Sequence, residues 1–141
     1  MIQESYCSFK IAQLLKEKGF DVPTQCAYKT DGRFKNLLEG TSYWDFGLLD
    51  WNHTNDLGDY GIAEWNGCIS CPTHQIAMKW LRKKGIYIYI QPTKYLGGAL
   101  YGFQSIIEDG RDGAWVKYIH HAENYEEAVE AALKYSLENL I

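Results

Sequence analysis

Two cysteines and a histidine form the clearest chemical pattern in the chain. Cys68 and Cys71 are separated by two residues, a spacing at which two thiolates bind one tetrahedral Zn²⁺ ion, and His74 follows three residues later. These residues supply part of a zinc site, so a further ligand has to come from another part of the chain. Cys71 also precedes Pro72 at an expected helix start, where the helix dipole favours a reactive thiolate. The remaining interpretation is two ordinary thiols, which predicts no metal and no cofactor.

Aromatic side chains are the second candidate, because they are more numerous than one small core requires. The chain of 141 residues contains 5 Trp, 11 Tyr and 5 Phe, which make up 15% of its residues. Many of them fall in two stretches, residues 44–65 and 87–101. The first stretch surrounds a loop, residues 52–59, that is rich in turn-forming residues and is the best candidate for an exposed functional loop. The predicted ligand-binding residues are Trp44, Trp51, His53, Tyr60, Trp65, Tyr87, Tyr89, Lys94, Tyr95, Tyr101 and Arg111.

Strand periodicity separates the tyrosines of the second stretch from the core. Tyr87 and Tyr89 alternate with isoleucines, so a strand here places the tyrosines on one face and the isoleucines on the other. A face of tyrosines can stack on bases or be buried in a subunit contact. Lys94 or Arg111 would then supply a cation for a phosphate. The alternative is that another segment of the chain covers this face.

Motifs of several enzyme classes are missing from the sequence. It contains no glycine-rich phosphate-binding loop, no Gly-x-Ser-x-Gly and no His-Glu-x-x-His. The formal charge of -4 lacks the basic excess of proteins that bind nucleic acids without selectivity. No apolar stretch approaches the roughly 18 residues of a membrane span, and the first residues lack the pattern of a signal peptide. We therefore expect a cytoplasmic protein with reduced cysteines and no membrane partner.

Hydrophobic periodicity and turn residues predict three helices and several short strands. Gly19 is expected to end the first helix, and Asn124 is expected to cap the last. The helices are expected at residues 4–18, 72–84 and 124–141. The strands are expected at residues 24–30, 33–38, 43–51, 60–65, 86–91, 99–108 and 114–121. This order, α-ββ-ββ-α-βββ-α, predicts a single α+β domain over residues 1–141, with a mainly antiparallel sheet and its helices on one face.

The helix-strand-strand-strand-helix order of the second half is also that of a double-stranded-RNA-binding domain. A local basic cluster accompanies it, formed by Lys79, Arg82, Lys83 and Lys84. The last helix opposes this interpretation because its surface is acidic, with Glu126, Glu127, Glu130 and Glu138.

Three short motifs lie along the chain: Tyr6-Cys7-Ser8-Phe9 with residues 14–20, Pro72-Thr73-His74-Gln75 with residues 78–82, and Tyr125-Glu126-Glu127-Ala128 before Leu133. They resemble motifs of small proteins encoded by phages and prophages of gut bacteria, a group with no assigned activity. The resemblance implies a phage accessory protein and brings no catalytic residues with it. The last strands and the motif at residues 125–128 are also similar to antitoxins of the HicB type.

These observations favour a non-enzymatic binding protein that uses an aromatic surface. We expect it to sequester a nucleotide-like signal or to block a host defence protein, as a homo-oligomer in the host cytoplasm. A double-stranded-RNA-binding-like or antitoxin-like module is one alternative. A small zinc-containing or thiol-based enzyme that uses Cys68, Cys71, His74 and His53 is the other.

Overall fold

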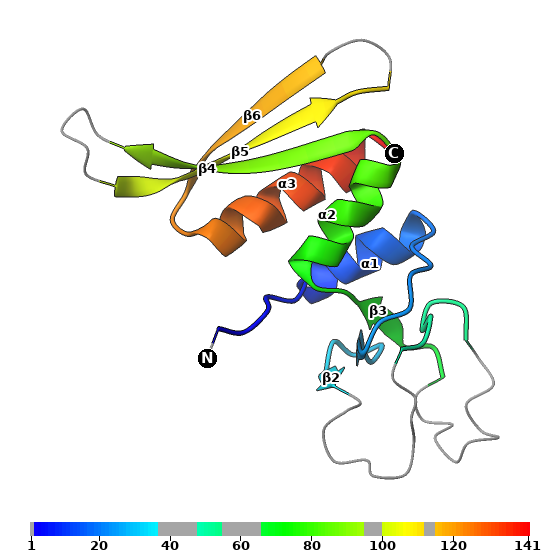
Figure 1. Cartoon of the computed structure of the whole chain (residues 1–141). Coiled ribbons are helices and arrows are strands. Elements are labelled where there is room, and N and C mark those ends of the chain that lie inside the picture. Colours follow the sequence, from blue (N-terminus) through cyan, green and yellow to red (C-terminus); the bar gives the residue numbers. More distant parts are fainter. Residues whose placement is uncertain (1, 37–47, 55–65, 95–99, 112–114) are drawn as a thin grey trace. The chain divides into compact units, whose positions relative to one another are not determined.

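The computed structural model describes residues 2–36, 48–54, 66–94, 100–111 and 115–141. Within these ranges it contains three helices and six strands, divided between two compact units (Figure 1). We call Tyr6–Thr73 the N-terminal unit, and Met1–Ser5 together with His74–Ile141 the C-terminal unit.

The N-terminal unit combines one helix with a small antiparallel sheet. Helix α1 (Phe9–Glu17) comes first and is followed by β1 (Cys26–Tyr28), β2 (Phe34–Asn36) and β3 (Ile69–Cys71). The strands lie in the order β2-β1-β3. Thr24 and Leu49 form a further antiparallel bridge in this unit.

Both ends of α1 follow from the local sequence. Ser8 is the N-cap, and its Oγ accepts a hydrogen bond of 3.3 Å from the N–H of the residue three positions later. At the other end Gly19 has a φ of 86°, a left-handed conformation that residues with a side chain disfavour. The N–H of Phe20 then donates to the carbonyl of Leu15 at 3.0 Å. The predicted stop at Gly19 is confirmed, and the helix begins after the expected Glu4 because Ser8 caps it.

The core on one side of the small sheet is built around Trp51. This residue packs with Ala27 and Cys68, and Leu49 covers part of the cluster. The indole N–H of Trp51 donates to the carbonyl of Thr24 at 3.0 Å, so its polar atom is satisfied inside the core.

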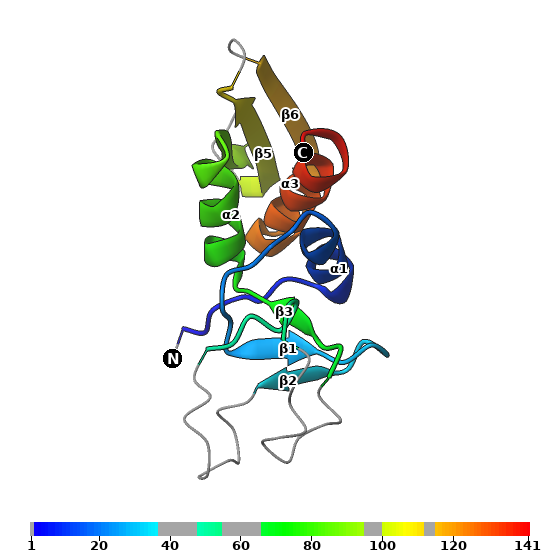
Figure 2. The same cartoon turned by 90° about the vertical axis from the view of Figure 1, so that its right-hand side faces the viewer.

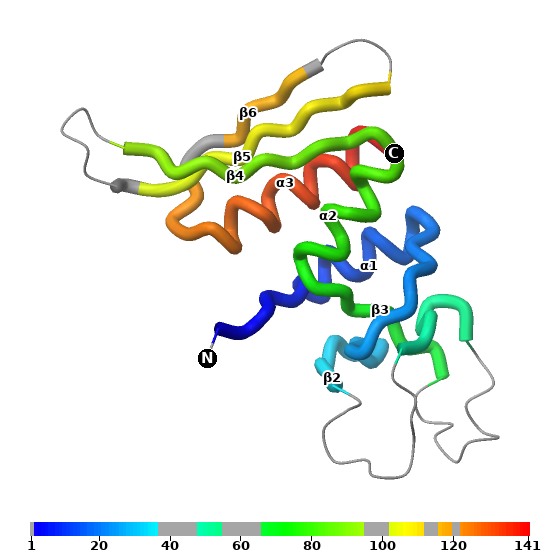
Figure 3. The backbone as a smooth tube through the Cα atoms, in the orientation of Figure 1, coloured from blue at the N-terminus to red at the C-terminus, as the bar shows by residue number. Residues whose placement is uncertain are grey.

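The C-terminal unit is an antiparallel sheet with two helices on one side of it (Figures 1 and 2). Its elements are α2 (His74–Lys83), β4 (Ile86–Lys94), β5 (Leu100–Asp109), β6 (Trp115–Ala122) and α3 (Tyr125–Asn139). The strands lie in the order β4-β5-β6, and the tube in Figure 3 shows them side by side. α3 packs across all three strands, and α2 packs on β4 and on α3.

Helix α3 begins as its sequence predicts. The side-chain oxygen of Asn124 accepts from the N–H of Glu127 at 2.9 Å, and a Glu127 carboxylate oxygen accepts from the N–H of Glu123 at 3.1 Å. The inward face of the helix is apolar and buried, and it includes Val129, Leu133 and Leu137. This face covers the sheet and closes the core of the unit.

The predicted α+β class, the three helices and the antiparallel pairing are confirmed. The strands form two sheets, however, whereas one mainly antiparallel sheet was expected. The chain, expected to be a single domain over residues 1–141, also divides into two compact units. β3 was not predicted, because its three residues are buried without alternation and its partner β1 lies far away along the chain. The strands expected at 43–51 and 60–65 lie mostly or wholly outside the described residues, apart from the bridge at Leu49.

Candidate functional site

The face of the β4-β5-β6 sheet that points away from the helices carries the candidate site. The strand register aligns its side chains in rows across the sheet. Tyr87, Glu108 and Val116 form the first row, Tyr89, Ile106 and Tyr118 the second, and Gln91 and Gln104 the third. We call these residues the outer face.

The tyrosines of the outer face are exposed because side chains alternate along a strand. Ile86 and Ile107 point inward and are fully buried in the core of the unit. The exposed fractions are 38% for Tyr87, 50% for Tyr89 and 53% for Tyr118. The predicted separation of the tyrosines from the isoleucines is therefore confirmed. Exposed large apolar side chains gathered on one face are typical of an interaction surface.

The polar side chains of the outer face lie in its first and third rows. Gln104 donates from Nε2 to Oε1 of Gln91 across the strand pair, at 2.6 Å. Glu108 carries the only formal charge among the residues that define this face. The surface is therefore aromatic along its middle row, with a carboxylate on one side and two carboxamides on the other.

The cations expected to bind a phosphate beside the tyrosines are not members of the outer-face rows. Arg111 donates to Asp109 at 3.0 and 2.9 Å, and to the carbonyl of Leu140 at 2.6 Å. Lys94 ends β4 beyond a register shift and outside the outer-face rows. The Arg111 guanidinium is therefore engaged by Asp109 and Leu140, and Lys94 lies outside the rows that contain Tyr87 and Tyr89.

Replacing Arg111 with glutamine is expected to raise the pKa of Asp109. Hydrogen bonds from the Arg111 side chain and backbone lower the pKa of this carboxyl from 3.8 to about 2. The ion pair therefore stabilises the fold above the ordinary pKa, and this contribution is lost as the pH falls through about 2. In the R111Q variant the carboxyl-carbon NMR signal of Asp109 should titrate above its wild-type value and still below 3.8, because the backbone N–H of residue 111 continues to donate to the carboxylate. An unchanged titration would contradict the assignment of Arg111 as the cause.

The aromatic stretch at 44–65 does not supply an exposed ring within the described residues. Trp51 is 1% exposed and belongs to the core, which corrects its prediction as a ligand-binding residue. Trp44, Tyr60 and Trp65 lie outside the described residues. Tyr95 does so as well, and Tyr101 lies in β5 but its side chain is not described.

His53 is exposed, as expected, and its contacts are local. Its ring Nδ1 lies 2.7 Å from Oδ2 of Asp50, three residues earlier. Its backbone N–H donates to the backbone carbonyl of Asp50 at 3.1 Å. The hydroxyl of Thr54 donates to the same carbonyl at 2.7 Å. These bonds hold a tight turn, and that structural role accounts for the pairing of Asp50 with His53.

Cys68 and Cys71 lie on opposite faces of the small sheet. Cys71 is the register partner of Cys26, whereas Cys68 packs in the cluster that contains Ala27. Because Cys26 and Ala27 are neighbours on one strand, they point to opposite faces. The two thiols of the Cys-x-x-Cys pattern therefore do not face one metal ion.

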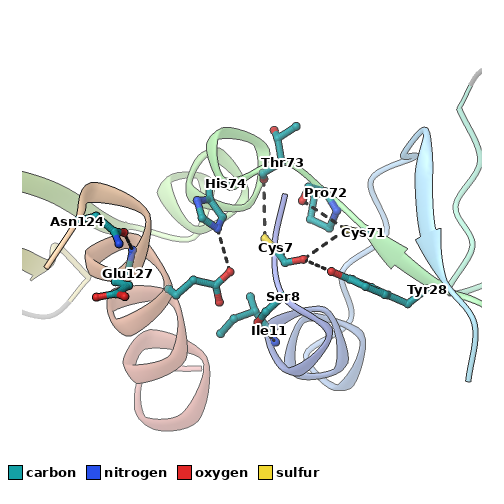
Figure 4. Close-up of polar contacts among 11 residues, drawn as sticks. Cys7, Ser8, Ile11, Tyr28, Cys71, Pro72, Thr73, His74, Asn124 and Glu127 are labelled. Atoms are coloured by element: carbon teal, nitrogen blue, oxygen red, sulfur yellow. Dashed lines mark hydrogen bonds and ion pairs between the residues drawn. The ribbon is translucent and has the colours of Figure 1, made fainter. Parts of the chain in front are cut away.

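The cysteines have the properties of core thiols. All four are buried and none is in a disulfide. Burial raises the pKa of Cys68, which disfavours the thiolate that a nucleophile or a metal ligand requires. The thiol of Cys71 and the hydroxyl of Tyr28 both donate to the carbonyl of Cys7, at 3.4 and 2.7 Å (Figure 4).

The third residue of the predicted zinc set has its own partner. His74 is buried in the C-terminal unit, and its Nε2 lies 2.9 Å from Oε1 of Glu130. In the part of the chain that the structure describes, no group of three or more His, Cys, Asp or Glu residues is arranged to bind a metal.

The contribution of β5 and β6 to the outer face was not predicted from the sequence. Tyr118 and Val116 alternate with inward residues of β6, and Lys117 between them lies with its Nζ 5.6 Å from the ring centroid of Tyr135 on α3. The alternation was visible in the sequence. The pairing that places Tyr118 level with Tyr89 across Ile106 was not, because it depends on the register of three strands.

Within the described residues, none of the helices has the length and apolar character to cross a membrane. Comparison of the chain with family models, with curated proteins and with solved structures finds no significant match.

Proposed function

We propose that this protein is a non-enzymatic binding protein that holds another protein against its outer face. The observation that carries the proposal is the set of three exposed tyrosines, Tyr87, Tyr89 and Tyr118, on a sheet face opposite the helices. Tyrosine offers a large rigid contact area with few rotatable bonds, and it is enriched among the residues that dominate binding energy at protein interfaces.

The charges on this face favour a protein over a phosphate-bearing ligand. A nucleotide that stacks on tyrosine also needs a cation for its phosphate. Glu108 is the charged member of the outer face, and Arg111 is engaged with Asp109. A carboxylate beside exposed rings repels a phosphate but accepts hydrogen bonds from a protein surface.

Such a protein acts by occupying a surface of its partner. This mode agrees with the expectation of a phage accessory protein that blocks a host defence protein, and that expectation stays part of the proposal. The four reduced cysteines agree with a cytoplasmic location.

RNA binding has weaker support. The α-β-β-β-α order of the C-terminal unit and the exposed cations of α2 are present as expected. However, Glu126 and Glu127 occupy the first turn of α3, and Lys84 lies with its Nζ 4.5 Å from the ring centroid of Trp80. Cations at the end of a helix also complement its dipole without any ligand. The basic cluster is therefore explained by its place at the end of α2, without an RNA ligand.

Photo-crosslinking from the outer face tests the proposal. p-Benzoylphenylalanine in place of Tyr89, in the full chain and in the cells that produce it, should give a protein adduct whose partner peptide mass spectrometry identifies. The same group in place of Lys134, exposed on α3, is the matched control and should give none. Equal yields at the two positions would contradict the proposal. If a nucleotide from a tested panel raised the melting temperature of the purified protein, the ligand of the outer face would be a nucleotide and not a protein.

A further inference from the structure

We infer that the protein that covers the outer face is a second copy of this chain, packed face to face about a two-fold axis. This inference rests on the proposed function and names the partner that occupies the same surface when no host protein is bound to it. Two sheets that pack through their faces lie about 10 Å apart with side chains interdigitating between them, as in a β-sandwich. A symmetric pair uses one patch twice, so the patch must be complementary to itself.

The three rows of the outer face meet that condition for one orientation of the axis. When the axis runs across the strands along the middle row, Tyr89, Ile106 and Tyr118 of one copy lie over the same residues of the other. The first row of each copy then lies over the third row of its partner. Glu108 therefore faces Gln104, and this contact occurs twice.

The chemistry of that contact is favourable. A carboxamide has two N–H donors, and the bond from Gln104 to Gln91 uses one of them. The second can donate to the Glu108 carboxylate of the other copy, as a charge-assisted hydrogen bond. The only formal charge of the outer face thus meets a donor, while the aromatic row is removed from water.

The other orientation of the axis is excluded by like charge. An axis that runs along β5, the central strand, leaves each row over itself, so Glu108 of one copy lies over Glu108 of the other. Two carboxylates brought together between packed sheets repel strongly because the surrounding dielectric is low. The position of Glu108 therefore selects the axis across the strands.

A charge-exchange series tests this pairing through the dimer dissociation constant, measured on the full chain by sedimentation equilibrium. Q104E places two like-charge pairs in the interface and should weaken the dimer about tenfold or more, whereas Q104K should tighten it. The double variant Q104E with E108K exchanges the partners and should return the constant to within about threefold of wild type.

Within one copy these positions do not interact strongly. Residues 104 and 108 lie four positions apart on one strand, about 13 Å, which exceeds the Debye length of about 10 Å at 0.1 M salt. Unfolding curves of each variant check that the fold is retained. A dissociation constant of Q104E equal to that of wild type would overturn the pairing. A double variant that dissociates as readily as Q104E would also overturn it.

Failure of this inference differs from failure of the proposed function. A monomeric wild-type chain that is crosslinked from residue 89 to another protein overturns the self-association and leaves the binding face in place. A chain that is monomeric and gives no adduct above the control position overturns both.

Discussion

Replacing Trp51 with alanine is expected to lower the free energy of unfolding by about 3–5 kcal/mol. The ring is 1% exposed and packs with Ala27 and Cys68, so its removal leaves a cavity in the centre of the N-terminal unit. The carbonyl of Thr24 also loses the hydrogen bond that the indole donates at 3.0 Å. Since whole domains are stable by only about 5–15 kcal/mol, the loss should be visible as a large decrease in the urea midpoint.

Two controls separate packing from the loss of an aromatic ring as such. Trp51→Phe loses the indole donor and one of the two fused rings but retains most of the volume, so it should destabilise less than alanine. Tyr118→Ala removes a ring that is 53% exposed and should change the stability of the isolated chain by no more than about 0.5 kcal/mol. If W51A unfolded at the wild-type urea concentration, the placement of Trp51 in the core would be wrong.

Replacing Tyr89 and Tyr118 together with serine is expected to abolish partner binding while leaving the fold intact. Both lie in the middle row of the outer face, where a covering protein excludes water most completely. Interface tyrosines of this kind contribute about 2 kcal/mol or more each, so the pair should weaken binding at least about a hundredfold. The measurement is the crosslinked fraction from p-benzoylphenylalanine in place of Val116, with and without the two serines.

Tyr125→Ser is the matched control for this double variant. Tyr125 is 39% exposed, close to the value for Tyr87, but it lies at the start of α3 rather than on the outer face. Its replacement should leave the crosslinked fraction unchanged. If the crosslinked fraction fell equally in both variants, the loss would not depend on the outer face. That result would contradict the binding role of the outer face.

Local patterns in the sequence predict the elements well where one residue decides the backbone. Gly19 ends α1 through a left-handed turn, and Asn124 caps α3 through its side-chain oxygen. Both effects act over fewer than about six residues, which is why they can be recognised without a tertiary structure. The alternation that exposes Tyr87 and Tyr89 is local in the same way.

Contacts between distant segments were not predictable in the same manner. Trp51 was expected at the end of a strand that flanks an exposed loop, and it is buried in the core beside Leu49, which pairs with Thr24 far away along the chain. Cys68 and Cys71 have the spacing of a zinc pair, yet β3 turns them to opposite faces once it pairs with β1. The outer face likewise depends on the register of β4, β5 and β6, which no short motif encodes.

Radical footprinting in the cells that produce the protein tests most directly whether a protein covers the outer face. Oxidation of Tyr89 and Tyr118 in the cell should be well below that in dilute purified chain, because the partner excludes water from the middle row. Tyr125 serves as the internal reference, since it is exposed on another element and should be oxidised equally in both conditions. Equal oxidation of Tyr89 and Tyr118 in the cell and in dilute solution would contradict the account.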